Sequence, residues 1–243
     1  GDGHGNLTYV YAVAKEIAPI LKKYCCINTK STVPFGTSLE IKNIIKKDKK
    51  DASFDVVSNP EIHREGSAIE DFMRPNRVII GCENEKSKKI MENIYQPLNL
   101  IQTPILFTDL KSAELIKYAS NAFLAMKISF INQMADLCES LNTDIHFISR
   151  GMGLDKRIGD KFLHPGPGYG GSCFPKDTIA LSKIASDNNV DLSIINNVIS
   201  YNKNRKKSLI KKINHILGND IKDMSFAVLG LSFKPGTDDM RES

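Results

Sequence analysis

The sequence predicts an α/β protein in which a doubly wound parallel sheet is followed by an all-helical middle and one further strand. Three observations lead to this prediction. Short apolar runs alternate with amphipathic stretches over residues 1–108. From about residue 109 to residue 142, nothing interrupts a helical pattern. At residues 225–231 the pattern of a buried strand returns.

The first part of the chain, residues 1–108, alternates between the two periodicities. Residues 7–23, 37–47 and 85–95 have the spacing of helices, and Thr37 is suited to cap the second of these. Strands are expected at residues 25–31, 54–58, 77–81 and 105–108. Because strands that alternate with helices usually form parallel sheets with both faces covered, we expect that arrangement here.

One long helix is expected at residues 109–142, and at 1.5 Å per residue it would be roughly 50 Å long. It carries apolar residues on two sides, which predicts burial from both directions. We therefore expect this helix to span two domains and to contribute to a homodimer interface. One apolar stripe consists of Phe123, Met126, Phe130, Met134, Leu137 and Leu141, and the other of Leu124, Ile128, Ile131 and Cys138.

The rest of the chain is predicted to be helical up to residue 217. A short helix at residues 144–150, a glycine-rich loop, a helix that opens with Pro175 and a helix at residues 192–217 complete this middle part. Residues 226–231, FAVLGL, then suggest a buried strand that leads into a glycine turn at residues 232–239.

The composition excludes several classes of function. With 243 residues, 41% hydrophobic and 25% charged, the chain has the make-up of a soluble globular protein of one or two domains. No apolar run is long enough to cross a bilayer, and no Cys/His spacing suggests a metal site. The net charge of +5 suits anionic small molecules such as nucleotides and is too mild for nucleic acid. Five cysteines, an odd number, predict a reducing, cytoplasmic location.

The strongest candidate for chemistry is the run GPGYGGSCFPKD at residues 166–177. Its glycines let the backbone approach a ligand closely. Cys173 would lie at a helix N-terminus, where the helix dipole and nearby Lys176 favour a thiolate, and Asp177 could hold a water or hydroxyl group. A buried, unreactive cysteine is the alternative, and these physical arguments leave the two about evenly matched.

Other polar residues lie at spacings that suit a site. Lys117 and Asn121 are four residues apart on the long helix, and together they could donate to an oxyanion. Glu61 and Glu65 are also four apart and would share a face if that segment were helical. Thr32 follows a predicted strand, at the edge where parallel sheets bind ligands. Exposed surface pairs, or a hydroxyl that stabilises a turn, are the alternatives.

Several runs together resemble a known family. GYGGSCFPKD at 168–177 is similar to the cysteine motif of the UDP-glucose/GDP-mannose dehydrogenase family, in its UDP-glucose branch. The runs at 151–164, STVP at 31–34 and ELIKYASNAF at 114–123 resemble the same family in the same order. NPEIHREG at 59–66 matches as well, although the family usually has Phe-Leu where this chain has Ile62-His63.

The resemblance implies an NAD-dependent, four-electron oxidation of UDP-glucose to UDP-glucuronate through a cysteine thiohemiacetal and thioester. It implies an NAD-binding Rossmann-like domain, of which residues 1–108 are the C-terminal part. Residues 109–217 would be a helical domain for dimerisation and substrate, and residues 218–243 the start of a UDP-binding domain. The chain would then begin late in the first domain and end early in the last. GDP-mannose, another nucleotide-sugar, or a non-catalytic helical dimer are the alternatives.

The resemblance also assigns roles to single residues. The cysteine nucleophile would be Cys173, helped by Lys117 and Asn121 at the oxyanion, while Asp177, Glu65 and Thr32 would act on water. Thr32 and Glu65 would also contact NAD, together with Lys176 and Arg241. Substrate contacts are implied for Glu61, Arg157, Phe162, Leu163, Tyr169, Gly170, Phe233 and Lys234.

Overall fold

The structure is a computed structural model that describes residues 6–61, 65–218 and 220–243. The chain forms two compact units, which divide between Ala119 and Ser120.

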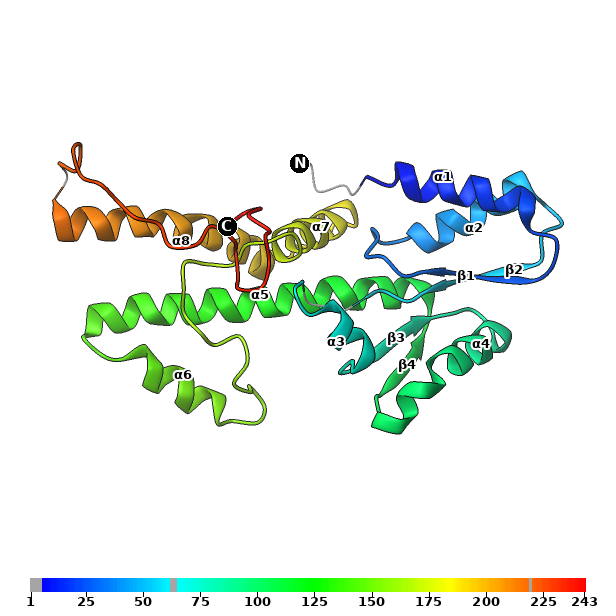
Figure 1. Cartoon of the computed structure of the whole chain (residues 1–243), viewed down its shortest axis with the longest axis horizontal. Coiled ribbons are helices and arrows are strands. Elements are labelled where there is room, and N and C mark those ends of the chain that lie inside the picture. The colour runs from blue at the N-terminus through cyan, green and yellow to red at the C-terminus, as the bar shows by residue number, and fades with distance from the viewer. Residues whose placement is uncertain (1–5, 62–64, 219) are drawn as a thin grey trace. The chain divides into compact units, whose positions relative to one another are not determined.

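The first unit contains a sheet and the helices that cover it (Figure 1). Every helix and strand expected for this part of the chain is present, with ends that differ by a few residues. A short helix, α3, was not expected. The elements are α1 (Thr8–Ile17), η1 (Ala18–Ile20), β1 (Cys25–Thr29), α2 (Thr37–Asp48), β2 (Phe54–Ser58), α3 (Ala68–Met73), β3 (Val78–Gly81), α4 (Glu85–Tyr95), η2 (Gln96–Ile101) and β4 (Ile105–Thr108).

The sheet has the strand order β1-β2-β3-β4, and it is mixed. β1 pairs with β2 in parallel and β3 with β4 in parallel, as expected. Between them, β2 and β3 are antiparallel and share the single pair Ser58↔Gly81, so the prediction of a wholly parallel sheet was wrong. The side chain of buried Asn59 donates to the carbonyl of Ile79 at 2.7 Å. This amide therefore supplies a hydrogen bond where the β2–β3 ladder is short.

Both faces of the sheet are covered, which confirms the doubly wound arrangement. One core cluster joins α1 and α2 to β1 and β2 and includes Ala14, Ile45 and Val56. The other joins α4 to β2 and β3 and includes Val57 and Met91. Because Val56 and Val57 are adjacent in β2, they point to opposite faces, so the strand is buried from both sides. Figure 1 shows α1 and α2 on one side of the sheet and α4 on the other.

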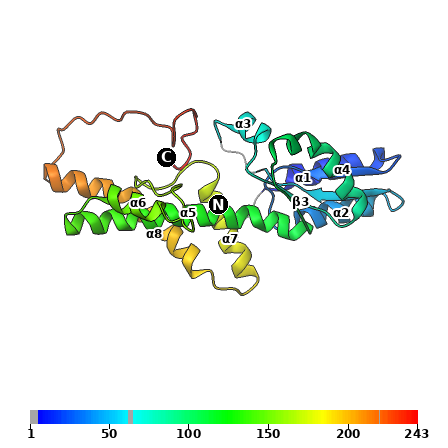
Figure 2. The same ribbon diagram turned by 90° about the horizontal axis from the view of Figure 1, so that it is seen from below.

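The second unit is helical up to residue 217, as the sequence predicts. The long helix α5 (Leu110–Leu141) begins in the first unit and contributes most of its length to the second. It is followed by α6 (Ile145–Gly153), α7 (Phe174–Asp187) and α8 (Ser193–Leu217). In both ribbon views α8 lies beside α5 (Figures 1 and 2). The hydroxyl of Tyr201 on α8 donates to Asp136 on α5 at 2.9 Å.

The strand expected at residues 226–231 is not present. These residues have no regular structure, and they are exposed, with Leu229 96% and Val228 73% accessible. A lone strand has unpaired N–H and C=O groups and no partner against which to bury its side chains. No strand among the described residues pairs with this segment, so its apolar pattern is not sufficient to fold it.

The described helices include none whose length and hydropathy together would allow it to cross a lipid bilayer.

A carboxylate from α5 holds the start of α2. Thr37 was expected as the cap, but the N-cap is Gly36, with φ of 88°, and the Thr37 hydroxyl donates instead to the carbonyl of Pro34. The side chain of Glu114, only 2% exposed, accepts hydrogen bonds from the N–H of Gly36 at 2.6 Å and of Ser38 at 2.9 Å. These are N–H groups that a helix leaves unbonded, and they favour a negative charge. Glu114 therefore fixes the loop after β1 to the long helix.

Replacing this carboxylate should destabilise the protein measurably. In Glu114→Gln an amide NH₂ would face one of the two N–H donors, so at least one bond is lost. We expect the free energy of unfolding to fall by about 1–3 kcal/mol in denaturant titrations of the full-length protein. Glu16→Gln, at an exposed position on α1, is the control and should change it by less than about 0.5 kcal/mol. Equal unfolding midpoints for the two variants would contradict this role of Glu114.

Candidate active site

Cys173 lies at the start of α7 and is exposed to solvent. It is the N-cap residue, and its carbonyl accepts the first helical bond, from the N–H of Asp177 at 2.9 Å. Its Sγ is 3.6 Å from the hydroxyl of Ser172. Pro175, expected at the first helical position, is at the second. Because the Cys173 side chain is exposed, the structure excludes the alternative of a buried cysteine.

Asp177 is directed into the unit, one helical turn after Cys173. Its carboxylate is almost completely buried and accepts a hydrogen bond from the Asn121 side-chain amide at 2.6 Å. The ammonium of Lys176 lies 3.9 Å from the other carboxylate oxygen. Asn121 is itself buried on α5. An amide nitrogen carries two hydrogens, so Asn121 can bond Asp177 and still offer a second donor.

Aromatic rings line the loop before Cys173. The ring of Phe174 lies 6.0 Å from that of Phe162 and 6.1 Å from that of Tyr169, the second pair edge to face. Burial raises the pKa of Tyr169, and a hydrogen bond with Thr178 partly opposes this. Phe162 has a φ of 64°, an uncommon conformation for a bulky residue that the surrounding packing must hold.

Leu163 and Tyr169, for which the resemblance implies substrate contacts, are buried with their side chains in the unit. The hydroxyl of Ser149 donates to the carbonyl of Leu163 at 2.6 Å. At these two positions the loop would therefore offer a ligand its backbone more than its side chains.

The end of the chain packs against the glycine loop. The N–H of Gly171 donates to the carbonyl of Arg241 at 2.9 Å. Gly171 has a φ of 77°, and a Cβ there would lie 2.7 Å from the Phe233 ring; a Cβ at Gly170 would lie 2.3 Å from the carbonyl of Glu242. Only glycine allows so close an approach at both positions.

Three cations for which the resemblance implies ligand contacts, two in this segment and one after α6, are at least partly accessible. The guanidinium of Arg241 pairs with Asp239 through bonds of 2.8 and 3.0 Å and is still largely exposed. The ammonium of Lys234 lies 5.3 Å from the centre of the Phe233 ring. Arg157, in the loop after α6, pairs with Asp155 and is 88% exposed. All three can therefore meet anions from solvent.

The remaining predicted residues belong to the first unit. Thr32 is half-buried and follows β1, as expected. Glu61 is exposed in irregular backbone and Glu65 lies in a turn, so neither residue is helical and the condition for a shared helix face is not met. The Ile62-His63 departure from the family pattern lies outside the described residues. Lys117 is buried, 6% exposed, one turn before Asn121 on α5.

A second lysine lies near Lys117. Burial lowers the pKa of Lys30, the carboxylate of Glu61 opposes that shift, and the positive charge of Lys117 adds to it. The backbone joins the same region, since the N–H of Glu61 donates to the carbonyl of Lys30 at 3.0 Å. Two cations and a carboxylate therefore gather just beyond the end of β1.

Matches to domain models of known families cover most of the chain. Residues 1–99 match the NAD binding domain of the UDP-glucose/GDP-mannose dehydrogenase family, and residues 111–204 match the central domain of the same family.

The chain belongs to the UDP-glucose/GDP-mannose dehydrogenase family.

Its similarity to individual members extends over the whole chain. It is 52% identical to a UDP-glucose 6-dehydrogenase of Rhizobium meliloti, covering 100% of this chain and 56% of the relative. Among solved structures, a UDP-glucose dehydrogenase of Pyrobaculum islandicum has 37% identity and a TM-score of 0.91, covering 100% of this chain and 56% of that one. A GDP-mannose dehydrogenase of Pseudomonas aeruginosa has 30% identity and a TM-score of 0.59, covering 98% and 55%. The chain thus spans about half the length of the relatives it matches.

Several polar residues of this family member that are buried, or half-buried in the case of Lys30, were missed by the sequence analysis. They are Lys30, Glu114, Asn132, Asn202 and Arg205, and each contacts a segment that carries predicted site residues. One signal was available on α8. Asn202 and Arg205 continue, at helical spacing, the buried stripe that begins with Ile195 and Val198. No group of three or more metal-binding side chains lies close together in the described part of the chain.

The cysteines differ in ways that bear on reactivity. Burial raises the pKa of Cys26 to about 11, with Asp55 as the next cause. Burial also raises the pKa of Cys82, although Lys88 partly opposes it. Since the thiolate is the nucleophile, both are poor candidates at neutral pH.

Alkylation at controlled pH should separate these thiols. With iodoacetamide at pH 8, exposed Cys173 should be labelled first, because a Cys26 pKa of about 11 leaves only about one thiolate in a thousand. The Cys26 rate should then rise about tenfold per pH unit until the pH nears 11. Peptide mapping of the labelled full-length protein measures both rates, with Cys173→Ser giving the background. Faster labelling of Cys26 than of Cys173 at pH 8 would contradict the assignment.

Proposed function

We propose that the protein containing this chain is an NAD-dependent UDP-glucose 6-dehydrogenase that oxidises the C6 alcohol to a carboxylate. The observation that carries this proposal is the exposed thiol of Cys173, at a helix N-terminus on a glycine loop and one turn from the buried Asp177–Asn121 pair. The family match supports the same chemistry. We also propose that residues 1–108 are part of the NAD-binding domain, residues 109–217 the helical central domain and residues 218–243 the start of a UDP-binding domain.

The cysteine is required by the second half of the reaction. Loss of a hydride and a proton from the C6 alcohol gives an aldehyde, and an aldehyde hydrogen leaves readily as hydride only once a nucleophile has made the carbon tetrahedral. The Cys173 thiolate adds to the carbonyl carbon and forms a thiohemiacetal. Loss of a second hydride and a proton gives a thioester, and water cleaves the C–S bond to release the carboxylate and the free thiol.

The surrounding polar residues would stabilise charge and direct water. Asn121 has a second amide hydrogen for an oxyanion while it is held by Asp177, and the ammonium of Lys117 would share this role. Asp177 and Glu65 are proposed to position or deprotonate the water that cleaves the thioester, with the hydroxyl of Thr32 as a hydrogen-bonding partner.

The residues present fit an NAD molecule by their chemistry. Thr32 offers a hydroxyl at the carboxyl end of β1, where open parallel sheets bind ligands, and Glu65 adds a carboxylate. Lys176 and Arg241 are exposed cations suited to a pyrophosphate. NAD, when bound there, accepts the hydride in each of the two oxidation steps.

UDP-glucose is the proposed substrate, and GDP-mannose is the alternative. The identity to the UDP-glucose enzymes reported above is higher than that to the GDP-mannose enzyme. Exposed Arg157 and half-buried Lys234 would meet the phosphates, while Glu61 and Phe233 would contact the nucleotide-sugar. The glycine loop, with Phe162, Leu163, Tyr169 and Gly170, would receive the sugar. No nucleic acid, membrane or metal takes part in this proposal.

A homodimer is proposed through the long helix. On α5, Phe123, Phe130, Leu137 and Leu141 form one stripe and are 44–65% exposed, and on α6 Phe147 is 73% exposed. Apolar surface of this extent usually marks an interface. We also propose a reducing, cytoplasmic location, which agrees with the free state of all five cysteines.

The reaction is tested by its stoichiometry in the full-length protein. Wild type with UDP-glucose should yield two NADH for each UDP-glucuronate formed. Cys173→Ser should form carboxylate at no more than about a thousandth of the wild-type rate. A serine hydroxyl is not ionised at neutral pH and is therefore a much weaker nucleophile than a thiolate. Ser172→Ala, next to the thiol, is the control and should keep both products.

Two results would overturn the proposed function. One is that the wild-type protein makes no NADH from UDP-glucose or GDP-mannose, which would favour a non-catalytic helical dimer. The other is undiminished carboxylate formation by Cys173→Ser.

The dimer is tested by placing a charge in the apolar stripe. Phe130→Glu would bury a carboxylate without a partner, so sedimentation equilibrium should report at least a tenfold weaker dimer. Ile194→Glu, at an exposed apolar position on α8, is the matched control and should sediment as wild type. A Phe130→Glu protein that remains as dimeric as wild type would place the interface elsewhere.

A further inference from the structure

The glycine loop before Cys173 is held by side chains and not by regular structure. Residues 163–171 contain no helix or strand, yet Leu163, Tyr169 and Gly171 are buried. Backbone N–H and C=O groups in such a place need partners, since leaving one unbonded costs free energy. At Gly166 and Tyr169, both backbone groups are bonded by side chains from α5 and α8.

Asn202 bonds both backbone groups of Tyr169. Its Oδ1 accepts from the Tyr169 N–H at 2.8 Å, and its Nδ2 donates to the Tyr169 carbonyl at 3.0 Å. Asn202 is buried, so neither bond competes with bulk water. The approach depends on Gly168, because a Cβ there would lie 2.6 Å from Asn202 Oδ1, and its φ is 119°.

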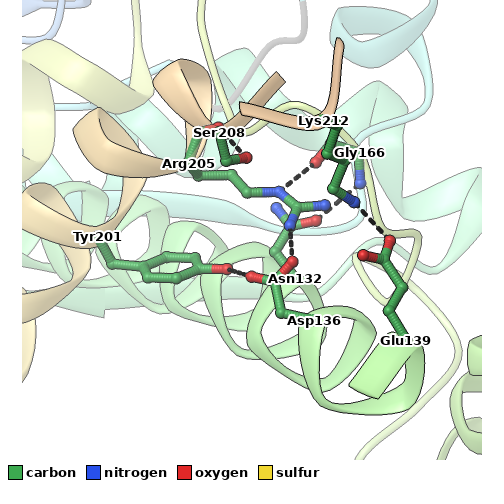
Figure 3. A network of polar contacts seen from close by, with 8 residues as sticks. All are labelled: Asn132, Asp136, Glu139, Gly166, Tyr201, Arg205, Ser208 and Lys212. Carbon is green, nitrogen blue, oxygen red and sulfur yellow. Dashed lines mark hydrogen bonds and ion pairs between the residues drawn. The ribbon is translucent and has the colours of Figure 1, made fainter. Parts of the chain in front are cut away.

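Arg205 and Asn132 do the same for Gly166, as Figure 3 shows. Asn132 accepts from the Gly166 N–H at 2.7 Å, and Arg205 Nε donates to the Gly166 carbonyl at 3.0 Å. The guanidinium of Arg205, 8% exposed, also pairs with Asp136. The hydroxyl of Tyr201 donates to the same carboxylate, and burial, followed by this bond, raises the pKa of Tyr201 to about 12.

We propose that Asn202 and Arg205 are positioning residues that set the conformation of the glycine loop and so the place of the sugar relative to Cys173. This inference rests on the proposed function, because it assigns the loop to the substrate. The fixed points are Gly166 and Tyr169, and Cys173 follows Tyr169 after only three residues. The side chains act through the backbone and need not touch the substrate.

The test uses an isosteric change in the full-length protein. In Asn202→Asp, one oxygen still accepts from the Tyr169 N–H, but the other faces the Tyr169 carbonyl oxygen and repels it. We expect KM for UDP-glucose to rise about tenfold, with kcat changed by less than about threefold, because loop binding is lost equally before and during the reaction. Hydrogen exchange of the amides at residues 163–171 should be faster by at least tenfold.

Two further variants separate positioning from folding. Asn204→Asp makes the same chemical change at an exposed position two residues away and should leave KM and exchange unchanged. Arg205→Lys keeps the charge opposite Asp136 but removes the planar fork that also reaches the Gly166 carbonyl, so it should raise KM in the same direction. It also tests the proposal if Asn202→Asp does not fold.

The outcomes are distinct. A purely structural role would lower the melting temperature and the amount of active enzyme while KM stays at the wild-type value, and that result would overturn the proposal. So would unchanged loop exchange in both Asn202→Asp and Arg205→Lys. Exchange is measured without substrate, so it does not depend on activity. If the wild-type protein made no NADH but loop exchange was still faster in Asn202→Asp than in the wild type, the proposed function would be refuted and the hydrogen-bonding role of Asn202 would stand.

Discussion

The hydrogen-bonding requirement of buried backbone is the constraint on which the candidate site depends. The loop before Cys173 lacks neighbouring strands, and its glycines would otherwise allow many conformations. Asn132, Asn202 and Arg205 reduce these to one by bonding Gly166 and Tyr169 from two helices. The packing of α8 on α5, where Tyr201 and Arg205 meet Asp136, thereby sets the loop geometry.

The starts of two helices serve the site in opposite ways. At α2, the N–H groups that have no partner in the helix bind the carboxylate of Glu114, so that end is occupied by the protein itself. At α7, the N-cap is Cys173, whose side chain makes no cap hydrogen bond. The positive end of the α7 dipole thus faces a thiol and, one turn on, the carboxylate of Asp177. The start of α2 thus fixes a loop, whereas the start of α7 presents a thiol that can act as a nucleophile.

Much of the fold follows from the sequence, because helical and strand periodicities are local. The strands β1 to β4 and helices α1, α2 and α4 to α8 occur where their patterns predict them. The orientation of β3 against β2 was not predictable, because alternation fixes the elements and not the direction in which neighbours pair, and the Asn59 side chain takes part in that contact. Residues 226–231 show the same limit, since a strand pattern needs a partner.

The site residues were predictable where they form a continuous motif. They were missed where the side chains that hold the loop lie far from it in the sequence. Asn202 is 33 residues from Tyr169, and Arg205 is 39 residues from Gly166. The only sign of them in the sequence is that these polar residues lie on the face of α8 that is otherwise apolar. Such positions are costly unless every group is bonded, and removing one member leaves the others unsatisfied. An apolar residue in place of Arg205 would remove the side-chain donor to the Gly166 carbonyl and the ion pair with Asp136, which would keep only its bond from Tyr201 among these contacts. These side chains therefore contribute mainly to specifying one loop conformation, more than to overall stability.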